Sequence, residues 1–135
     1  MSHKPSVLYF EDEPMSRMVM EMLLKRGLGF DDVTIFEDSA DFQNRISNLA
    51  TTPDIVFLDI HIEPYNGFDM LKMLREHPRF ERSRIIALTA SVMNEEIQML
   101  QDAGFDGGIA KPIDQVTFPQ LLERILDGDV VWSIV

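Results

Sequence analysis

An uninterrupted apolar run over residues 55–58 leads directly into Asp59, and it constrains the fold more than any other stretch. Its residues do not alternate with polar ones, so the pattern predicts a central parallel strand that is buried on both faces. Pro64 and Gly67 then mark a loop. Asp59 is therefore expected at the carboxyl end of a buried strand, where open α/β sheets form their sites. Taken alone, Asp59 would favour a simpler interpretation, as a helix cap or a solvated acid at a strand end.

The rest of the chain alternates between short apolar runs and helical patterns. Strict alternation predicts one doubly wound α/β domain, with a parallel sheet, right-handed crossovers and helices on both faces. Strands are predicted over 7–10, 33–36, 55–59, 85–88 and 105–110. Helices are predicted from Pro14 to about Gly27, from Asp38 or Ser39 to about Leu49, from Gly67 to about Glu76, from Ser91 or Asn94 to Ala103, and from Asp114 or Thr117 to Gly128.

The first helix carries a methionine-rich stripe. Met15, Met18, Val19, Met22 and Leu23 recur at the spacing of one helix face. We interpret this stripe as core packing, with an adaptable binding surface as the alternative.

Composition excludes several classes of function. The formal net charge of −11 would repel backbone phosphates, so we expect no nucleic-acid partner. The acid excess suits a metal site or a basic partner, or serves only solubility. The chain has no cysteine, which excludes disulfides and thiolate metal sites. It shows no signal-peptide pattern and no apolar stretch of membrane-spanning length, so a cytoplasmic protein without membrane contact is expected.

The last seven residues form a distinct apolar tail. The 135-residue chain is long enough for one domain, which we assign to residues 1–128, with the tail at 129–135. The tail contains Val130, Val131 and Trp132. It either folds back on the domain or offers an apolar patch to a partner.

Chemically useful side chains gather at the predicted strand ends. Because the carboxyl ends of parallel strands share one edge of the sheet, Glu11, Asp12, Asp59, Thr89 and Lys111 are expected to converge. Three neighbouring carboxylates require a cation, and oxygen ligands select Mg²⁺, or Mn²⁺, over zinc. A lysine and a hydroxyl suit phosphoryl oxygens. This set permits attack by an aspartate on phosphorus, giving an aspartyl-phosphate.

At this point the chain resembles the receiver domains of two-component response regulators over essentially its whole length. The ending around Lys111 is similar to that of small stand-alone regulators. The resemblance implies a flavodoxin-like sheet with five strands in the order 2-1-3-4-5. The matching signals, in order and at family spacing, are Glu11-Asp12, Asp59, Gly67, Thr89-Ala90 and Lys111-Pro112.

The resemblance also implies a role for each matching residue. Asp59 would accept a phosphoryl group from a histidine of a kinase or a phosphotransfer protein. Asp12 and Asp59 would bind Mg²⁺, with Glu11 acting directly or through water, and the backbone carbonyl of His61 would be a further ligand.

The phosphoryl group has its own implied partners. Thr89 and the amide of Ala90 would bind its oxygens, and Lys111 would pair with its charge. The Lys111–Pro112 bond is cis in the family. Such a domain assists its own phosphorylation and dephosphorylation but is not a metabolic enzyme.

The sequence departs from the family pattern at two informative positions. Glu63 stands where many members have proline, and Pro64 follows, so the local path of the loop is expected to differ. Gly108 stands where the family has an aromatic switch residue. The sequence therefore supports two hypotheses. The first is a single-domain regulator that signals by protein contact or onward phosphotransfer, with a homodimer left open. The second is a binding module that does not depend on phosphorylation.

Two enzyme classes are weaker alternatives. A phosphatase of the haloacid dehalogenase type needs a second acid two residues after its nucleophile, and His61 stands there. A flavin-binding protein of the flavodoxin type needs a phosphate loop after the first strand. Acidic residues follow that strand instead and would repel the flavin phosphate.

Overall fold

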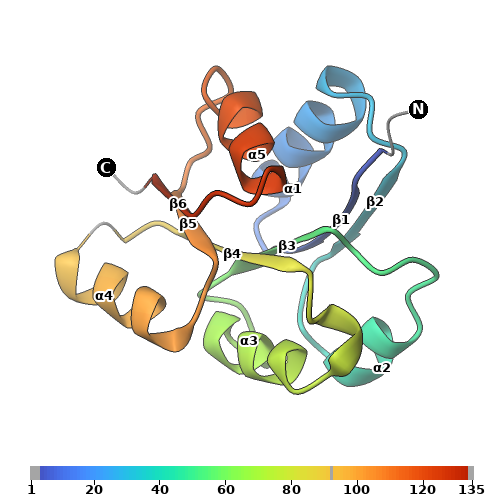
Figure 1. Cartoon of the computed structure of the whole chain (residues 1–135), viewed down its shortest axis with the longest axis vertical. Helices are drawn as coiled ribbons and strands as arrows, with labels where there is room; N and C mark the ends of the chain where they lie inside the picture. The colour runs from blue at the N-terminus through green and yellow to red at the C-terminus, as the bar shows by residue number, and fades with distance from the viewer. Residues whose placement is uncertain (1–3, 92, 134–135) are drawn as a thin grey trace.

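One parallel sheet with helices on both faces forms the domain (Figure 1). The computed structural model describes residues 4–91 and 93–133. Within these residues the sheet has six strands in the order β2-β1-β3-β4-β5-β6, so the doubly wound α/β prediction is confirmed, and the predicted count of five strands was one too low. The strands are β1 (Ser6–Phe10), β2 (Asp32–Phe36), β3 (Ile55–Asp59), β4 (Arg84–Thr89), β5 (Gly107–Ala110) and β6 (Val131–Ser133).

The helices divide between the two faces of the sheet. Figure 1 shows α1 and α5 over one face and α2, α3 and α4 over the other. No helix among the described residues is long and apolar enough to cross a membrane. The helices are α1 (Pro14–Glu21), continued by a π-helical segment (Met22–Gly27), α2 (Phe42–Ser47), α3 (Gly67–Arg75), a short 3-10 turn (Pro78–Phe80), α4 (Asn94–Ala103) and α5 (Phe118–Leu126).

The central strands are buried on both faces, as the apolar runs predict. Every residue of β1 and β3 is buried. Successive side chains point to opposite faces, so Leu8 and Phe10 join the cluster under α2, α3 and α4, whereas Val7 and Tyr9 join the cluster under α1 and α5. The strands that lead to the acidic residues are thus buried along their whole length.

The core interpretation of the α1 methionines was wrong. Met15, Met18 and Met22 are 60%, 55% and 50% exposed. The buried residues of this segment are instead Met20 and Leu24, which pack against β1 and β3. Two apolar stripes overlap on this helix, and the sheet covers the one that the spacing argument did not select.

Helix α2 begins later than predicted because its expected caps bond elsewhere. The hydroxyl of Ser39 donates to the carbonyl of Tyr65 (2.7 Å) and accepts from the Tyr65 amide (2.6 Å). Asp38 accepts from the amide of Ala40 (3.0 Å) and pairs with Arg45 (3.1 Å). These contacts hold the β2–α2 connection against the loop that follows β3.

The caps of the later helices were predicted with mixed success. Asn66 caps α3 as expected, in a reciprocal box with Asp69. Asn94 is the first residue of α4 rather than its cap, and Met93 before it makes no side-chain cap bond. Thr117 precedes α5 without a side-chain cap bond, and Asp114 accepts from the amide of Val116 (2.9 Å) in the turn before the helix.

Part of the C-terminal tail forms the sixth strand. β6 pairs in parallel with β5, with Gly107 opposite Val131 and Gly108 opposite Trp132. A Cβ atom on residue 107 would lie 2.5 Å from the carbonyl oxygen of Val131, so glycine is needed for this approach. Val131 is buried, so this part of the tail folds back rather than standing free. Ile134 and Val135 lie outside the described residues.

Candidate functional site

Three carboxylates meet where β1 and β3 end. Glu11 and Asp12 follow β1, and Asp59 is the last residue of β3, its neighbour in the sheet. One carboxylate oxygen from each residue lies within 4.8 Å of the other two. Glu11 and Asp59 are buried, and Asp12 is exposed. The sequence argument that these acids converge on one edge of the sheet is borne out by this geometry.

Lys111 follows β5, which lies two strands from β3 in the sheet, and its side chain reaches the carboxylates. Its ammonium lies 2.9 Å from Oε2 of Glu11 and 3.5 Å from Oδ2 of Asp59. The Lys111 amide donates to the carbonyl of Thr89 (2.8 Å), and this bond fixes the backbone position from which the Lys111 side chain extends. A lysine so placed can partly neutralise the acids and can hold an oxygen anion attached to Asp59. The Lys111–Pro112 bond is cis, as the resemblance implied.

Asp59 and Glu11 differ in how readily they bind a proton. Burial, followed by the hydrogen bond and the negative charge of Glu11, raises the pKa of Asp59 to about 7. Burial also acts to raise the pKa of Glu11, but hydrogen bonds from Asp59, Lys111 and Tyr9 outweigh it, so this pKa lies below its usual value. In the metal-free site Asp59 thus holds a proton most readily, and a cation that replaces this proton stabilises its ionised form.

The remaining predicted residues lie around Asp59, but their roles are not tested by their positions. The His61 amide donates to Oδ1 of Asp59 (3.3 Å), which orients the carboxylate. Thr89 is buried at the end of β4, and its hydroxyl accepts from the Ser91 amide (3.1 Å). Ala90 is exposed immediately beyond Thr89. The carbonyl of His61 as a metal ligand and the amide of Ala90 as a phosphoryl donor stay predictions.

Sequence reasoning missed one residue of the site, Tyr9. Its side chain is fully buried, and its hydroxyl donates to Oε1 of Glu11 at 2.8 Å. The available signal was spacing, since residues two apart on a strand point to the same face. A tyrosine within an aliphatic run, two residues before Glu11, was instead counted only as part of the core.

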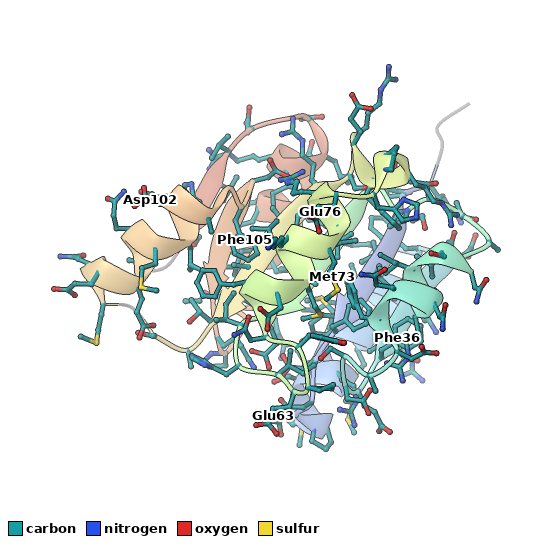
Figure 2. All side chains as sticks on the ribbon, turned by 90° about the horizontal axis from the view of Figure 1, so that it is seen from below. Phe36, Glu63, Met73, Glu76, Asp102 and Phe105 are labelled. Atoms are coloured by element: carbon teal, nitrogen blue, oxygen red, sulfur yellow. The ribbon has the colours of Figure 1, made fainter. Side chains whose placement is uncertain are left out.

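A polar cleft opens beside the carboxylates. It has a volume of about 710 Å³, and its lining includes Asp12, His61, Glu63 and Asp69. The Glu63–Pro64 bond in this loop is cis, and a loop path that differs from the family's stays a prediction. Figure 2 shows Glu63 near the lower edge of the domain, away from Glu76 and Asp102. Of the three acids, Asp12 lines this cleft and is open to solvent there.

The donor set fits a hard divalent cation. The three acids supply oxygen ligands without sulfur, and oxygen is the ligand that Mg²⁺ prefers. The exposed acid lies on the cleft side, where water molecules can complete an octahedral shell. Glu11, Asp12 and Asp59 would therefore hold Mg²⁺, and the ion would supply charge neutralisation beside the Asp59 carboxylate.

Comparison with known families agrees with this geometry. The sequence model of the response regulator receiver domain matches residues 7–124. The chain therefore belongs to the receiver domain family of two-component response regulators. This is a family of signalling proteins rather than of metabolic enzymes.

Individual relatives show the same likeness. The nitrate/nitrite response regulator homolog of Haemophilus influenzae is 32% identical over 98% of this chain, which spans 62% of that protein's length. The receiver domain of a Pseudomonas aeruginosa sensor histidine kinase has a TM-score of 0.79 at 24% identity, covering 93% of this chain and all of that one. That structure has a magnesium ion coordinated in its active-site cleft. A chemotaxis response regulator of Vibrio cholerae has a TM-score of 0.77 at 22% identity, covering 91% of this chain and 99% of that one.

Removing the charge of Asp59 is expected to stabilise the metal-free domain. At pH 8, Asp59→Asn should raise the free energy of unfolding by about 1 kcal/mol, because it relieves repulsion between buried carboxylates. The folded pKa of about 7 exceeds the unfolded value, so wild-type stability falls as pH rises through 7 and recovers as Asp59 gains its proton below it. The advantage of the variant should therefore shrink towards pH 5.

Urea unfolding in EDTA at pH 5 and pH 8 measures this difference. Adding Mg²⁺ at pH 8 should stabilise the wild type and leave Asp59→Asn unchanged, since a bound ion adds stability only to a state that binds it. An advantage that is the same at both pH values would show that repulsion at Asp59 is not its cause.

Proposed function

We propose that this chain is a cytoplasmic, single-domain response regulator that accepts a phosphoryl group on Asp59 from a phosphohistidine of a kinase or phosphotransfer protein. A carboxylate oxygen of Asp59 attacks phosphorus, the phosphorus–nitrogen bond to the donor histidine breaks, and the imidazole leaves with its electron pair and takes up a proton. Mg²⁺ held by Glu11, Asp12 and Asp59 supplies charge neutralisation for this transfer. The protein then signals by contact with another protein or by onward phosphotransfer.

The observation that carries this proposal is the position of Lys111. Its ammonium lies 3.5 Å from Oδ2 of Asp59, close enough to pair with a phosphoryl oxygen attached to that carboxylate. The hydroxyl of Thr89, one strand away, is the second group that can bind such an oxygen. Glu11 and Asp12 lie close to Asp59, as metal ligands beside the acceptor are required to do.

The surface beside the site supports contact with a donor protein. A mainly apolar cavity of about 150 Å³ between α1 and the β5–α5 loop is lined by Met15, Val19, Lys111 and Ile113, among others. Met15 and its exposed neighbours on α1 form a flexible apolar face of the kind that packs against protein partners. A donor that docks there places its histidine next to Lys111.

The proposal is tested by intact-mass measurement after incubation with acetyl phosphate. Wild-type protein with Mg²⁺ should gain a single phosphoryl adduct, and EDTA should prevent it. Asp59→Asn should show no adduct, whereas Asp54→Asn, which changes a carboxylate at the opposite end of β3, should react as the wild type does. An adduct on the Asp59→Asn protein would show that another residue is the acceptor.

Fast hydrolysis could hide the adduct, so a stable analogue provides the second measurement. Beryllofluoride occupies the phosphoryl position without forming a hydrolysable acyl phosphate. Saturable, Mg²⁺-dependent binding that Asp59→Asn abolishes is the expected result. Absence of both the adduct and this binding would contradict the proposed function.

One observation favours a second candidate, a binding module that does not depend on phosphorylation. Gly108 has no side chain to couple the site to the α4–β5–α5 surface, and β6 pairs along the outer edge of β5. On this hypothesis partner binding would be the same for wild type and Asp59→Asn. The emission of Trp132, the single tryptophan, separates the two, since only a coupled domain changes it when beryllofluoride binds.

A further inference from the structure

We infer that Tyr9 is a positioning residue, whose hydroxyl holds the Glu11 carboxylate in the orientation that the metal site requires. The inference rests on the proposed function, because it concerns the same Mg²⁺ site. The evidence is the set of hydrogen bonds that surrounds Glu11, the only fully buried carboxylate of the three.

The backbone of Glu11 is fixed on both sides. Its amide donates to the carbonyl of Phe36 at 3.0 Å, which continues the β1–β2 pairing beyond the strand end. Its carbonyl accepts from the guanidinium of Arg17 at 2.9 Å. The remaining freedom of Glu11 therefore lies in its side-chain torsions, which set where the two carboxylate oxygens point.

Different donors hold the two carboxylate oxygens. Oε2 accepts from Lys111 (2.9 Å) and, at 3.3 Å, from the amide of Glu13. Oε1 accepts from the Tyr9 hydroxyl at 2.8 Å. Lys111 is shared with Asp59, so its bond to Glu11 weakens whenever Asp59 carries more negative charge. The Tyr9 hydroxyl is not shared with Asp59, so its bond to Glu11 persists whether Asp59 carries more or less negative charge.

Tyr9 is suited to this task because packing holds its ring in place. The ring is fully buried and lies edge-on to Phe57, with 6.3 Å between ring centroids, so packing fixes the direction in which the hydroxyl points. A phosphoryl group on Asp59 would draw Lys111 towards it, and Tyr9 would then be the side chain that keeps Glu11 in place.

The test is the Mg²⁺ dissociation constant of Tyr9→Phe. It is measured by titrating the protein with MgCl₂ and recording the NMR signals of the backbone amides. This substitution removes one buried oxygen atom and keeps the ring. Loss of a group that orients a metal ligand typically weakens metal binding 10–100-fold, and we expect about tenfold. Tyr65→Phe is the matched control, because that ring is 42% exposed and its hydroxyl makes no hydrogen bond to the three carboxylates; its Mg²⁺ affinity should equal that of the wild type.

A second variant separates positioning from simple loss of packing. Ile125→Val removes a buried methyl group from the same apolar cluster, at a residue on α5. It should lower the unfolding temperature in EDTA yet leave the Mg²⁺ dissociation constant equal to that of the wild type. Equal affinity of Tyr9→Phe and wild type would overturn the inference, and so would equal weakening in Tyr9→Phe and Ile125→Val. Failure of the wild type itself to bind Mg²⁺ would overturn the proposed metal site and the inference with it.

Discussion

Lys111→Met is expected to lower the free energy of unfolding by about 3 kcal/mol in the absence of divalent cations. Breaking a buried ion pair leaves its partner charge without compensation, which typically costs about 3–5 kcal/mol. Here the carboxylates left without their ion-pair partner are Glu11, which is fully buried, and Asp59, which is 4% exposed. Proton uptake by one of the acids relieves part of the repulsion, so we place the effect at the lower end of the range.

Mg²⁺ should narrow the difference between Lys111→Met and wild type. Without the lysine, the three acids have no fixed cation, and the metal ion becomes their sole compensation. Urea unfolding with EDTA and with Mg²⁺ measures both effects. The matched control is Lys25→Met, because Lys25 pairs with Glu21 at 3.3 Å on an exposed helix face, and such pairs contribute less than about 1 kcal/mol. Equal losses in the two lysine variants would rule out the buried pair as the cause.

Gly107→Ala is expected to displace β6 and to lower the free energy of unfolding by about 2 kcal/mol, as overpacking in a core typically does. The added Cβ would lie 2.5 Å from the carbonyl oxygen of Val131 and 3.2 Å from Cδ1 of Ile86. Ile86 can rotate, but the Val131 carbonyl is backbone and moves only with the strand. Loss of the β5–β6 pairing would expose Val131 and move the partly buried Trp132 into water.

The emission maximum of Trp132 reports this displacement directly, since it is the single tryptophan of the chain. A red shift in the native state, without loss of helical circular dichroism, is the expected signal. Gly27→Ala is the control, because its added Cβ would lie 3.8 Å from the carbonyl oxygen of Met22, which is an ordinary van der Waals contact. An unshifted Trp132 spectrum in Gly107→Ala would contradict the close approach of β6.

The strands and the site were predictable because they depend on strong local patterns. Unbroken apolar runs fixed β1 and β3, and the shared edge of a parallel sheet then brought Glu11, Asp59 and Lys111 together. Glycine and asparagine also marked the start of α3 correctly, since Asn66 is a side-chain cap. These features need no knowledge of which elements pack together.

The errors occurred where tertiary contacts decide. The rotation of α1 depends on how the helix lies on the sheet, so the spacing of Met15 and Met18 could not reveal that both are exposed. Ser39 was expected as a cap, but it bonds to the loop after β3, which is distant in sequence. The role of the Tyr9 hydroxyl was missed for the same reason. Its hydrogen bond depends on how the Glu11 side chain is oriented, and periodicity does not show this.

The sixth strand also changes which backbone groups the sheet presents to other chains. An unpaired edge strand is a template for strand addition and aggregation, and proteins guard such edges by shortening or covering them. β6 occupies the outer side of β5 and, as far as the chain is described, is an outermost strand of three residues at that end. The longer five-residue edge is β2, which begins with the charged Asp32. The tail thus protects the glycine-weakened strand from pairing with a neighbouring molecule.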